Sequence, residues 1–215
     1  MSRNFKLLLM ELKYHETYCK PWTPLTPGRG ERRLFLENRE ISGRRAKAAG
    51  LLFEHQVEGA CSWYRQQGIA SIEKTPEPTK YIRSLSNGRF IACYEKQAQP
   101  DFKGILKDGT CVVFDAKHTD ADMISQSVVL LQQWELLDTY ESMGGHCFIL
   151  VSMGFKDYFR VPWSVWKTMK ERYGHKHMSR ADLWPYKVPS RLFVAFLEGI
   201  ELRDDDEDED GDGDG

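Results

Sequence analysis

The sequence predicts a mixed α/β domain, and three observations carry this prediction. Apolar residues recur at helical spacing up to residue 66, two apolar runs joined by Lys107-Asp108-Gly109 have the pattern of paired strands, and a further buried strand follows from residue 146. Helices that alternate with strands in this order pack against a mixed sheet. The 215 residues include 41% hydrophobic side chains, which is enough for one buried core.

The first half of the chain predicts a helix, a strand and a hairpin. A helix is expected over residues 45–66, where apolar side chains recur every three or four residues and Gly68 follows the last one. Residues 69–72 form a short strand in this interpretation. Asn87-Gly88 is a strong tight-turn signal, so residues 79–95 are expected to form a protruding β-hairpin.

The second half predicts the rest of the sheet and two more helices. Helical spacing runs through residues 121–142 until Gly144-Gly145, and Pro162 opens a helix that ends near Tyr173. An aromatic run over residues 192–197 is expected to pack on the domain before the acidic tail. The expected strands are residues 101–106, 111–117, 146–151 and 158–161.

The charge is distributed very unevenly along the chain. Residues 204–215 read DDDEDEDGDGDG and hold nine of the 32 acidic residues, which leaves 30 basic against 23 acidic residues elsewhere. A basic body suits a polyanion such as nucleic acid. We expect a basic, proline-containing arm over residues 1–43, a folded domain over 44–200 and a disordered acidic tail over 201–215. The tail either solubilises the protein or competes with DNA for the basic body.

Cysteine spacing and hydropathy exclude several protein classes. The five cysteines lie far apart and form no CxxC pair, which excludes a secreted disulfide scaffold and a cysteine-rich zinc module. Every apolar run is shorter than the roughly 20 residues of a membrane span. Residues 5–10 are too few, and too broken by Lys6, for the core of a signal peptide. We therefore expect a cytoplasmic protein with no membrane partner.

Asp101, Asp115 and Lys117 form the pattern with the clearest chemistry. A tight turn joins their strands, and residues 115 and 117 share one face because strand side chains repeat every two residues. Paired carboxylates suit Mg²⁺, with Mn²⁺ as a substitute. A lysine beside them can position or deprotonate an attacking water, or stabilise charge on a phosphoryl group. The plainer interpretation is a solvated strand end with a weak ion pair.

Two side chains on neighbouring helices extend this pattern. Glu54 lies on the first helix and is either a third carboxylate for the metal or a helix-surface residue. Gln133 lies on the helix after Lys117, where it is a candidate to contact a phosphate or hold the water. The basic body fits a phosphodiester substrate.

Five sequence blocks follow one another along the chain: GLLFE at 50–54, GIASIEKTPEP at 68–78, DFKG at 101–104, FDAKHT at 114–119 and GGHCFIL at 144–150. In this order they resemble the RecU family of Holliday-junction resolvases within the PD-(D/E)xK nuclease superfamily. The resemblance covers about residues 44–200, and Asp115 stands where the family usually has Glu.

The resemblance implies a restriction-endonuclease-like fold and a metal-dependent endonuclease acting on branched DNA. It implies Asp101 and Asp115 as metal ligands assisted by Glu54, with Lys117 and Gln133 completing the catalytic set. A homodimer is implied because a four-way junction has two-fold symmetry, and the hairpin would be the stalk that enters the junction. The cations expected to bind DNA are Arg44, Arg45, Lys47, Lys74, Lys80, Arg83, Arg89 and Lys103.

Two alternatives to this function stay open at the level of the sequence. One is another DNA nuclease on the same fold, either a RecB-like exonuclease or a restriction-type repair enzyme. The other is a DNA-binding modulator of recombination without catalysis. The presence of Asp101, Asp115 and Lys117 together argues against the second alternative.

Overall fold

The computed structural model of the chain describes residues 29–76, 79–85, 87, 89–94 and 99–200. The chain divides into two compact units, Met1–Gly43 and Arg44–Gly215. Residues 1–28 of the predicted arm and the whole acidic tail lie outside the described residues. In the described part, no helix is both long and apolar enough to span a membrane.

Helix α2 spans Arg29–Gln66 and therefore begins well before the predicted start at residue 45. Residues 29–44 are rich in Arg, Glu and Leu, which are good helix formers, and the chain has no proline between Pro27 and Pro76. The proline-rich stretch before Arg29 led to the prediction of an arm over residues 1–43, whereas residues 29–43 belong to this helix.

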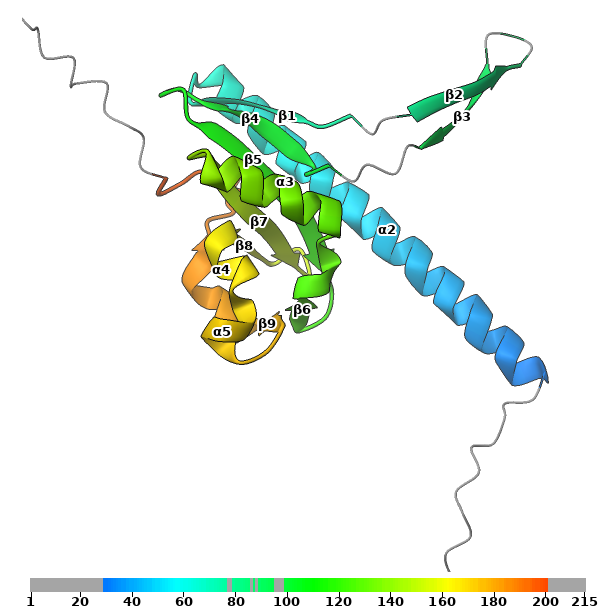
Figure 1. The fold of residues 1–215 in the computed structure, drawn as a ribbon. Helices are drawn as coiled ribbons and strands as arrows, with labels where there is room; N and C mark the ends of the chain where they lie inside the picture. The colour runs from blue at the N-terminus through cyan, green and yellow to red at the C-terminus, as the bar shows by residue number, and fades with distance from the viewer. Residues whose placement is uncertain (1–28, 77–78, 86, 88, 95–98, 201–215) are drawn as a thin grey trace, which may run out of the picture. The chain divides into compact units, whose positions relative to one another are not determined.

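A six-stranded mixed sheet forms the centre of the second unit (Figure 1). Its strand order is β1-β4-β5-β7-β8-β10, and all neighbours pair antiparallel except β5 and β7, which are parallel. The mixed sheet predicted from the sequence is thus confirmed. The strands are β1 (Ala70–Lys74), β4 (Phe102–Leu106), β5 (Cys111–Thr119), β7 (His146–Met153), β8 (Asp157–Pro162) and β10 (Lys187–Val188).

The predicted hairpin is present as a separate two-stranded sheet (Figure 1). Strand β2 (Thr79–Ser84) pairs antiparallel with β3 (Phe90–Tyr94). At its tip the Leu85 N–H donates to the Arg89 carbonyl at 2.7 Å, and Asn87 has a positive φ of 65°. Asparagine tolerates this left-handed conformation better than most residues, which explains why the tight-turn signal was reliable here.

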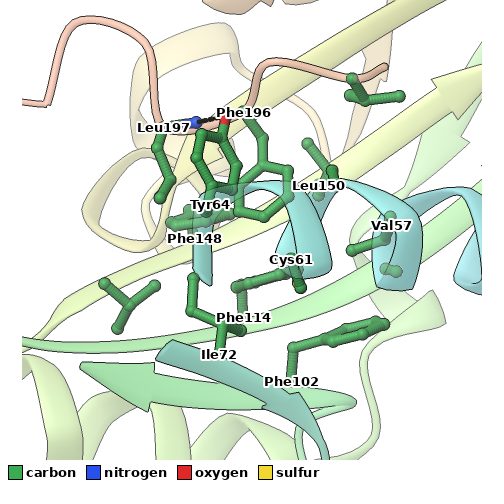
Figure 2. Packing of buried hydrophobic residues seen from close by; sticks show 14 of the residues in the cluster. Val57, Cys61, Tyr64, Ile72, Phe102, Phe114, Phe148, Leu150, Phe196 and Leu197 are labelled. Carbon is green, nitrogen blue, oxygen red and sulfur yellow. Dashed lines mark hydrogen bonds between the residues drawn. The ribbon is translucent and has the colours of Figure 1, made fainter. Parts of the chain in front are cut away.

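One face of the six-stranded sheet is covered by residues 53–64 of α2. Phe53, Val57 and Tyr64 are buried against ring side chains of the sheet. Phe114 of β5 stacks between Phe102 and Phe148, with ring centroids 5.0 and 4.6 Å away (Figure 2). These rings remove a large apolar area from water and fix the relative position of β4, β5 and β7.

The opposite face is covered by α3 (Leu131–Ser142), α4 (Trp163–Lys167) and α5 (Met169–Tyr173). Val113 of β5 belongs to this second core, whereas Phe114 belongs to the first, as the alternation of strand side chains requires. Trp163 and Trp166 are fully buried here. The odd-numbered residues of β5 therefore point toward α3.

The C-terminal segment returns to the α2 face of the sheet. It follows α6 (Arg180–Leu183) and the 3₁₀ turn η2 (Trp184–Tyr186). The Leu197 N–H donates to the buried Tyr64 hydroxyl at 3.1 Å, and Phe196 packs edge-on against the Tyr64 ring (Figure 2). This agrees with the expectation that the aromatic run before the tail packs on the domain.

The predicted helix over residues 121–142 is only partly correct. Its first third forms β6 (Met123–Ser125) and the 3₁₀ turn η1 (Gln126–Val128), and α3 begins only at Leu131. Strand β6 pairs with β9 (His177–Ser179), a partner about fifty residues later that local spacing does not reveal. The predicted helix over residues 162–173 is likewise split into α4 and α5 at Thr168.

Gly104 allows β1 and β4 to approach closely. A Cβ atom built at this position would overlap the Ser71 carbonyl and the Ile72 Cα. No side chain larger than hydrogen fits there unless the strands move apart. The glycine in the DFKG block therefore fixes the spacing of two strands just after Asp101.

Candidate active site

Asp101, Asp115 and Lys117 meet where β4 begins and the second half of β5 runs past it. Phe102 lies opposite Phe114 in the antiparallel pair, which places Asp101 next to Asp115. The Ala116 N–H donates to Asp101 Oδ2 at 2.9 Å. Residues 115 and 117 share the face toward α3, as their spacing predicted. The structure thus brings together the three residues on which the sequence analysis concentrated.

Asp115 is fully buried, and each of its oxygens has a different environment. Oδ1 accepts a hydrogen bond from Gln133 Nε2 at 2.7 Å. Oδ2 meets the Lys117 ammonium in an ion pair, but it accepts no hydrogen bond of ordinary geometry from the described residues. A buried carboxylate is costly unless its charge is compensated. Oδ2 is the oxygen of this site that a cation would satisfy.

The electrostatics of the cluster favour an added positive charge. Burial raises the pKa of Asp101 to about 7, and the nearby charge of Asp115 adds to the effect, while Lys117 opposes it. For Lys117, burial acts to lower the pKa, but the charges of Asp115 and Asp101 outweigh it and the pKa is raised. Two largely buried carboxylates thus share one ammonium.

The donor set fits a hard divalent cation with an incomplete protein shell. The described residues contain no group of three or more His, Cys, Asp or Glu side chains arranged to hold a metal ion. Asp101 and Asp115 therefore offer two carboxylates, and the other positions would fall to water and substrate. Mg²⁺ is commonly held in this way, by one or two carboxylates with several waters and phosphate oxygens.

Glu54 lies on α2 and does not join the two aspartates directly. Its Oε2 is 2.7 Å from Lys74 Nζ, and Glu58 Oε1 is 3.5 Å from the same ammonium. The carboxylate is close enough to Lys117 to contribute to its raised pKa. Glu54 therefore belongs to the surroundings of the cluster, with Lys74 as its direct partner.

Gln133 is buried, and both ends of its amide are hydrogen-bonded within the protein. Besides Asp115, Nε2 donates to the Gln99 carbonyl at 3.2 Å, and Oε1 accepts the Leu130 N–H at 3.1 Å. The sequence predicts that Gln133 contacts a phosphate or the water. In the structure its amide holds Asp115 and the segment before Asp101.

The predicted DNA-binding cations differ in their surroundings. Lys74 is paired with Glu54, and Lys103 Nζ donates to Gln99 Oε1 at 2.9 Å, so both have protein partners. The side chain of Lys80, on β2, lies outside the described residues. The remaining cations are exposed, on α2 (Arg44, Arg45 and Lys47) and on the hairpin (Arg83 and Arg89).

Gln99 is the site residue that the sequence analysis missed. Its carbonyl and its side chain are both bonded, to Gln133 and to Lys103 respectively. It lies between the hairpin and Asp101, where the sequence has no periodic pattern. Only its position two residues before Asp101 could have pointed to it.

Comparison with known proteins identifies the family. The model of the RecU family, recombination protein U, matches residues 48–201. The Holliday junction resolvase RecU of Streptococcus sanguinis (strain SK36) is 27% identical over 108 residues, which are 47% of this chain and 54% of that protein. The chain therefore spans about half the length of this curated relative.

A solved structure shows a weaker likeness. Archaeoglobus fulgidus Hjc, described as a Holliday junction resolvase from an archaeal hyperthermophile, gives a TM-score of 0.41 at 13% identity, over 72% of this chain and 98% of that chain. The family match, in contrast, covers well over half of the sequence and contains Glu54, Asp101, Asp115, Lys117 and Gln133. On this match, the chain belongs to the RecU family.

Proposed function

We propose that this chain is a divalent-metal-dependent endonuclease that hydrolyses phosphodiester bonds in four-way DNA junctions, a crossover junction endodeoxyribonuclease. The observation that carries the proposal is the Asp101, Asp115 and Lys117 cluster in a member of the RecU family. Dependence on a divalent metal ion is general in this family. The two-carboxylate donor set favours Mg²⁺, with Mn²⁺ as a substitute.

Each residue of the cluster has a role that follows from its contacts. Asp101 and Asp115 would hold the metal, which when bound lowers the pKa of a water and neutralises phosphoryl charge. Glu54 would act through a water, because Lys74 already occupies its carboxylate. In its ion pair with Asp115, the Lys117 ammonium can donate hydrogen bonds and supplies positive charge. This favours orientation of the water or stabilisation of phosphoryl charge over removal of a proton.

Charge and symmetry support the choice of substrate and assembly. The exposed cations of α2 and of the hairpin carry charges that suit a phosphate backbone. A four-way junction has two equivalent strands to cut, so two copies of one active site related by a two-fold axis would match it. We therefore propose a homodimer that acts on branched DNA, with the β2–β3 hairpin entering the junction.

The test is a cleavage assay of the full-length protein with Mg²⁺ on a synthetic four-way junction, a linear duplex of the same sequence and a single strand. We expect cleavage of the junction only, and none when the metal is chelated. Degradation of the linear substrates from their ends would favour an exonuclease. Junction binding without cleavage in either Mg²⁺ or Mn²⁺ would favour a non-catalytic modulator of recombination.

A further inference from the structure

We infer that Gln133 is a positioning residue, whose single amide fixes Asp115 and the Gln99–Asp101 segment relative to each other. The three hydrogen bonds of this amide account for its two N–H groups and its oxygen. Neither N–H group is left over for a phosphate or a water, and the oxygen is turned toward the Leu130 N–H. Gln133 thus acts through Asp115 and Asp101 and does not touch the reacting atoms.

The orientation of the amide follows from its neighbours. On one side lies the Asp115 carboxylate, which only accepts hydrogen bonds, together with the Gln99 carbonyl, which also only accepts. On the other side lies the Leu130 N–H, which only donates. A flipped amide would place Oε1 against the Asp115 and Gln99 oxygens and Nε2 against the Leu130 N–H. The environment therefore requires Nε2 toward Asp115 and Oε1 toward Leu130.

The same bonds join the base of the hairpin to the two carboxylates. After the hairpin, the Gln99 carbonyl is held by Gln133 and its side chain by Lys103. Before the hairpin, the Thr75 N–H donates to the Asp101 carbonyl at 2.8 Å. Both flanks of the hairpin thus meet at residues 99–101. Gln133 ties this meeting point to Asp115, so the metal ligands and the hairpin base share one hydrogen-bonded framework.

The importance of this framework for catalysis rests on the proposed function, but the positioning role is measurable without it. In the metal-free protein, Asp101 holds two backbone amides, those of Thr75 and Ala116. If Gln133 fixes the segment that carries Asp101, removal of its side-chain amide should make the amide hydrogens of Thr75 and Ala116 exchange faster. A residue that served only as a metal ligand would leave them unchanged until metal was added.

The experiment is hydrogen exchange on the full-length, metal-free protein with Gln133→Met, which keeps side-chain length and removes all three hydrogen bonds. We expect the amides of Thr75 and Ala116 to exchange about ten-fold faster or more, as the loss of about one buried hydrogen bond implies. Amides between β7 and β8 report global stability and correct for it. Gln132→Met, on the exposed neighbouring position of α3, is the matched control and should exchange like the wild type.

Mn²⁺ affinity of the same DNA-free proteins, measured by calorimetry, is the second readout. Loss of an outer residue that orients a ligand typically weakens metal affinity about 10–100-fold, and we expect this for Gln133→Met with unchanged junction affinity. Weaker Mn²⁺ binding with wild-type exchange at Thr75 and Ala116 would overturn the inference and make Gln133 a direct ligand. Unchanged exchange and unchanged affinity would overturn it as well. If Gln133→Met does not fold, Gln133→Asn, with its shorter stem, should shift both readouts in the same direction.

Different results would contradict the proposed endonuclease function and the positioning role of Gln133. A wild-type protein that cuts no junction would contradict the proposed function, while the exchange result would still decide the role of Gln133. A wild type that cuts junctions, with amide exchange indifferent to Gln133, would contradict only the positioning role.

Discussion

Asp115 is the residue on which the proposed chemistry depends most directly. It is fully buried, Gln133 holds one of its oxygens, and the other has only the Lys117 ion pair as compensation. The period-two pattern of the sequence was sufficient to place Asp115 and Lys117 on one face. It was not sufficient to show that Glu54 pairs with Lys74, because that contact depends on how α2 lies against β1.

Asp115→Asn or Asp101→Asn should abolish cleavage of a four-way junction while leaving junction binding intact or tighter. Each change removes a proposed metal ligand and acidic charge that DNA binding does not need, and the rate loss should reach about 1,000-fold, or about 4 kcal/mol. Single-turnover cleavage and equilibrium binding measure the two effects separately. Asp120→Asn, on an exposed residue just beyond β5, is the control and should cleave like the wild type.

Asp157 gives a pH-dependent prediction at a distance from the site. The hydrogen bond from Lys187 lowers the pKa of this carboxyl most strongly, burial opposes it, and the charges of Lys187 and Arg180 add to the lowering. A lowered pKa in the folded state contributes stability above the unfolded pKa of about 3.9, and this stability is lost as the pH falls through the folded value.

Asp157→Asn should therefore lower the free energy of unfolding by about 0.5–1 kcal/mol at pH 7, given that both partners are partly exposed. The deficit should shrink as the pH falls below about 4. Urea denaturation of both proteins at pH 7 and in acid measures it, with Glu135→Gln as an exposed control. A deficit that stays constant across this range would show that the ion pairs do not stabilise the fold.

At the scale of elements, the sequence predicted strands and their partners best where segments that are neighbours in the chain are also neighbours in the sheet. The hairpin and the β4–β5 pair are joined by short turns, so their partners could be identified locally. The helix predicted over residues 121–142 was wrong at its start because β6 pairs with β9, far along the chain. Gln99 was missed for the same reason, since its partner is on α3.

We expect the hairpin to contribute to junction recognition and to have no effect on metal affinity. Ile82, Leu85 and Phe90 are exposed, between 46% and 62%, on an element that also carries two exposed arginines. Replacing residues 82–91 by Asn-Gly keeps Thr75 and Gln99 and removes these side chains. We expect junction affinity to fall about ten-fold, or about 1.4 kcal/mol, with Mn²⁺ affinity unchanged.

The contributions of the hairpin's charge and of its shape to DNA binding can be measured separately. Arg83→Gln combined with Arg89→Gln keeps the hairpin length, so it should weaken junction and duplex binding alike and flatten the salt dependence. If the shortened hairpin binds junction and duplex as the wild type does, the hairpin has no role in recognition.

The Tyr64 hydroxyl should contribute to the stability of the C-terminal segment. Tyr64→Phe removes the acceptor of the buried Leu197 N–H and leaves this donor unsatisfied (Figure 2). We expect the free energy of unfolding to fall by about 1–3 kcal/mol. Chemical denaturation measures the change, and Tyr140→Phe, on a half-buried ring of α3, should cost less than about 0.5 kcal/mol. Equal costs in the two variants would mean that ring packing and the hydrogen bonds from Arg160 to the Phe196 and Glu198 carbonyls hold the segment without the hydroxyl.

At the scale of the whole molecule, the order of the sequence blocks and the distribution of charge along the chain gave more information about function than any one motif. The blocks that resemble RecU occur in family order, and the family match covers residues 48–201. The strongly basic body, once the acidic tail is set apart, agrees with a phosphodiester substrate. The path of the C-terminal segment over α2 was not predictable in detail, because its contacts join residues 64 and 197 across most of the chain.

The central claim is that two copies of this site cut a four-way junction at equivalent positions. The most direct test maps the nicks on all four strands of a synthetic junction after incubation with the full-length protein and Mg²⁺. We predict two nicks, placed symmetrically on one pair of opposing strands, and none with Asp115→Asn under the same conditions. Nicks at unrelated positions, equal cleavage of the linear duplex, or nicking by Asp115→Asn at the wild-type rate would contradict the claim.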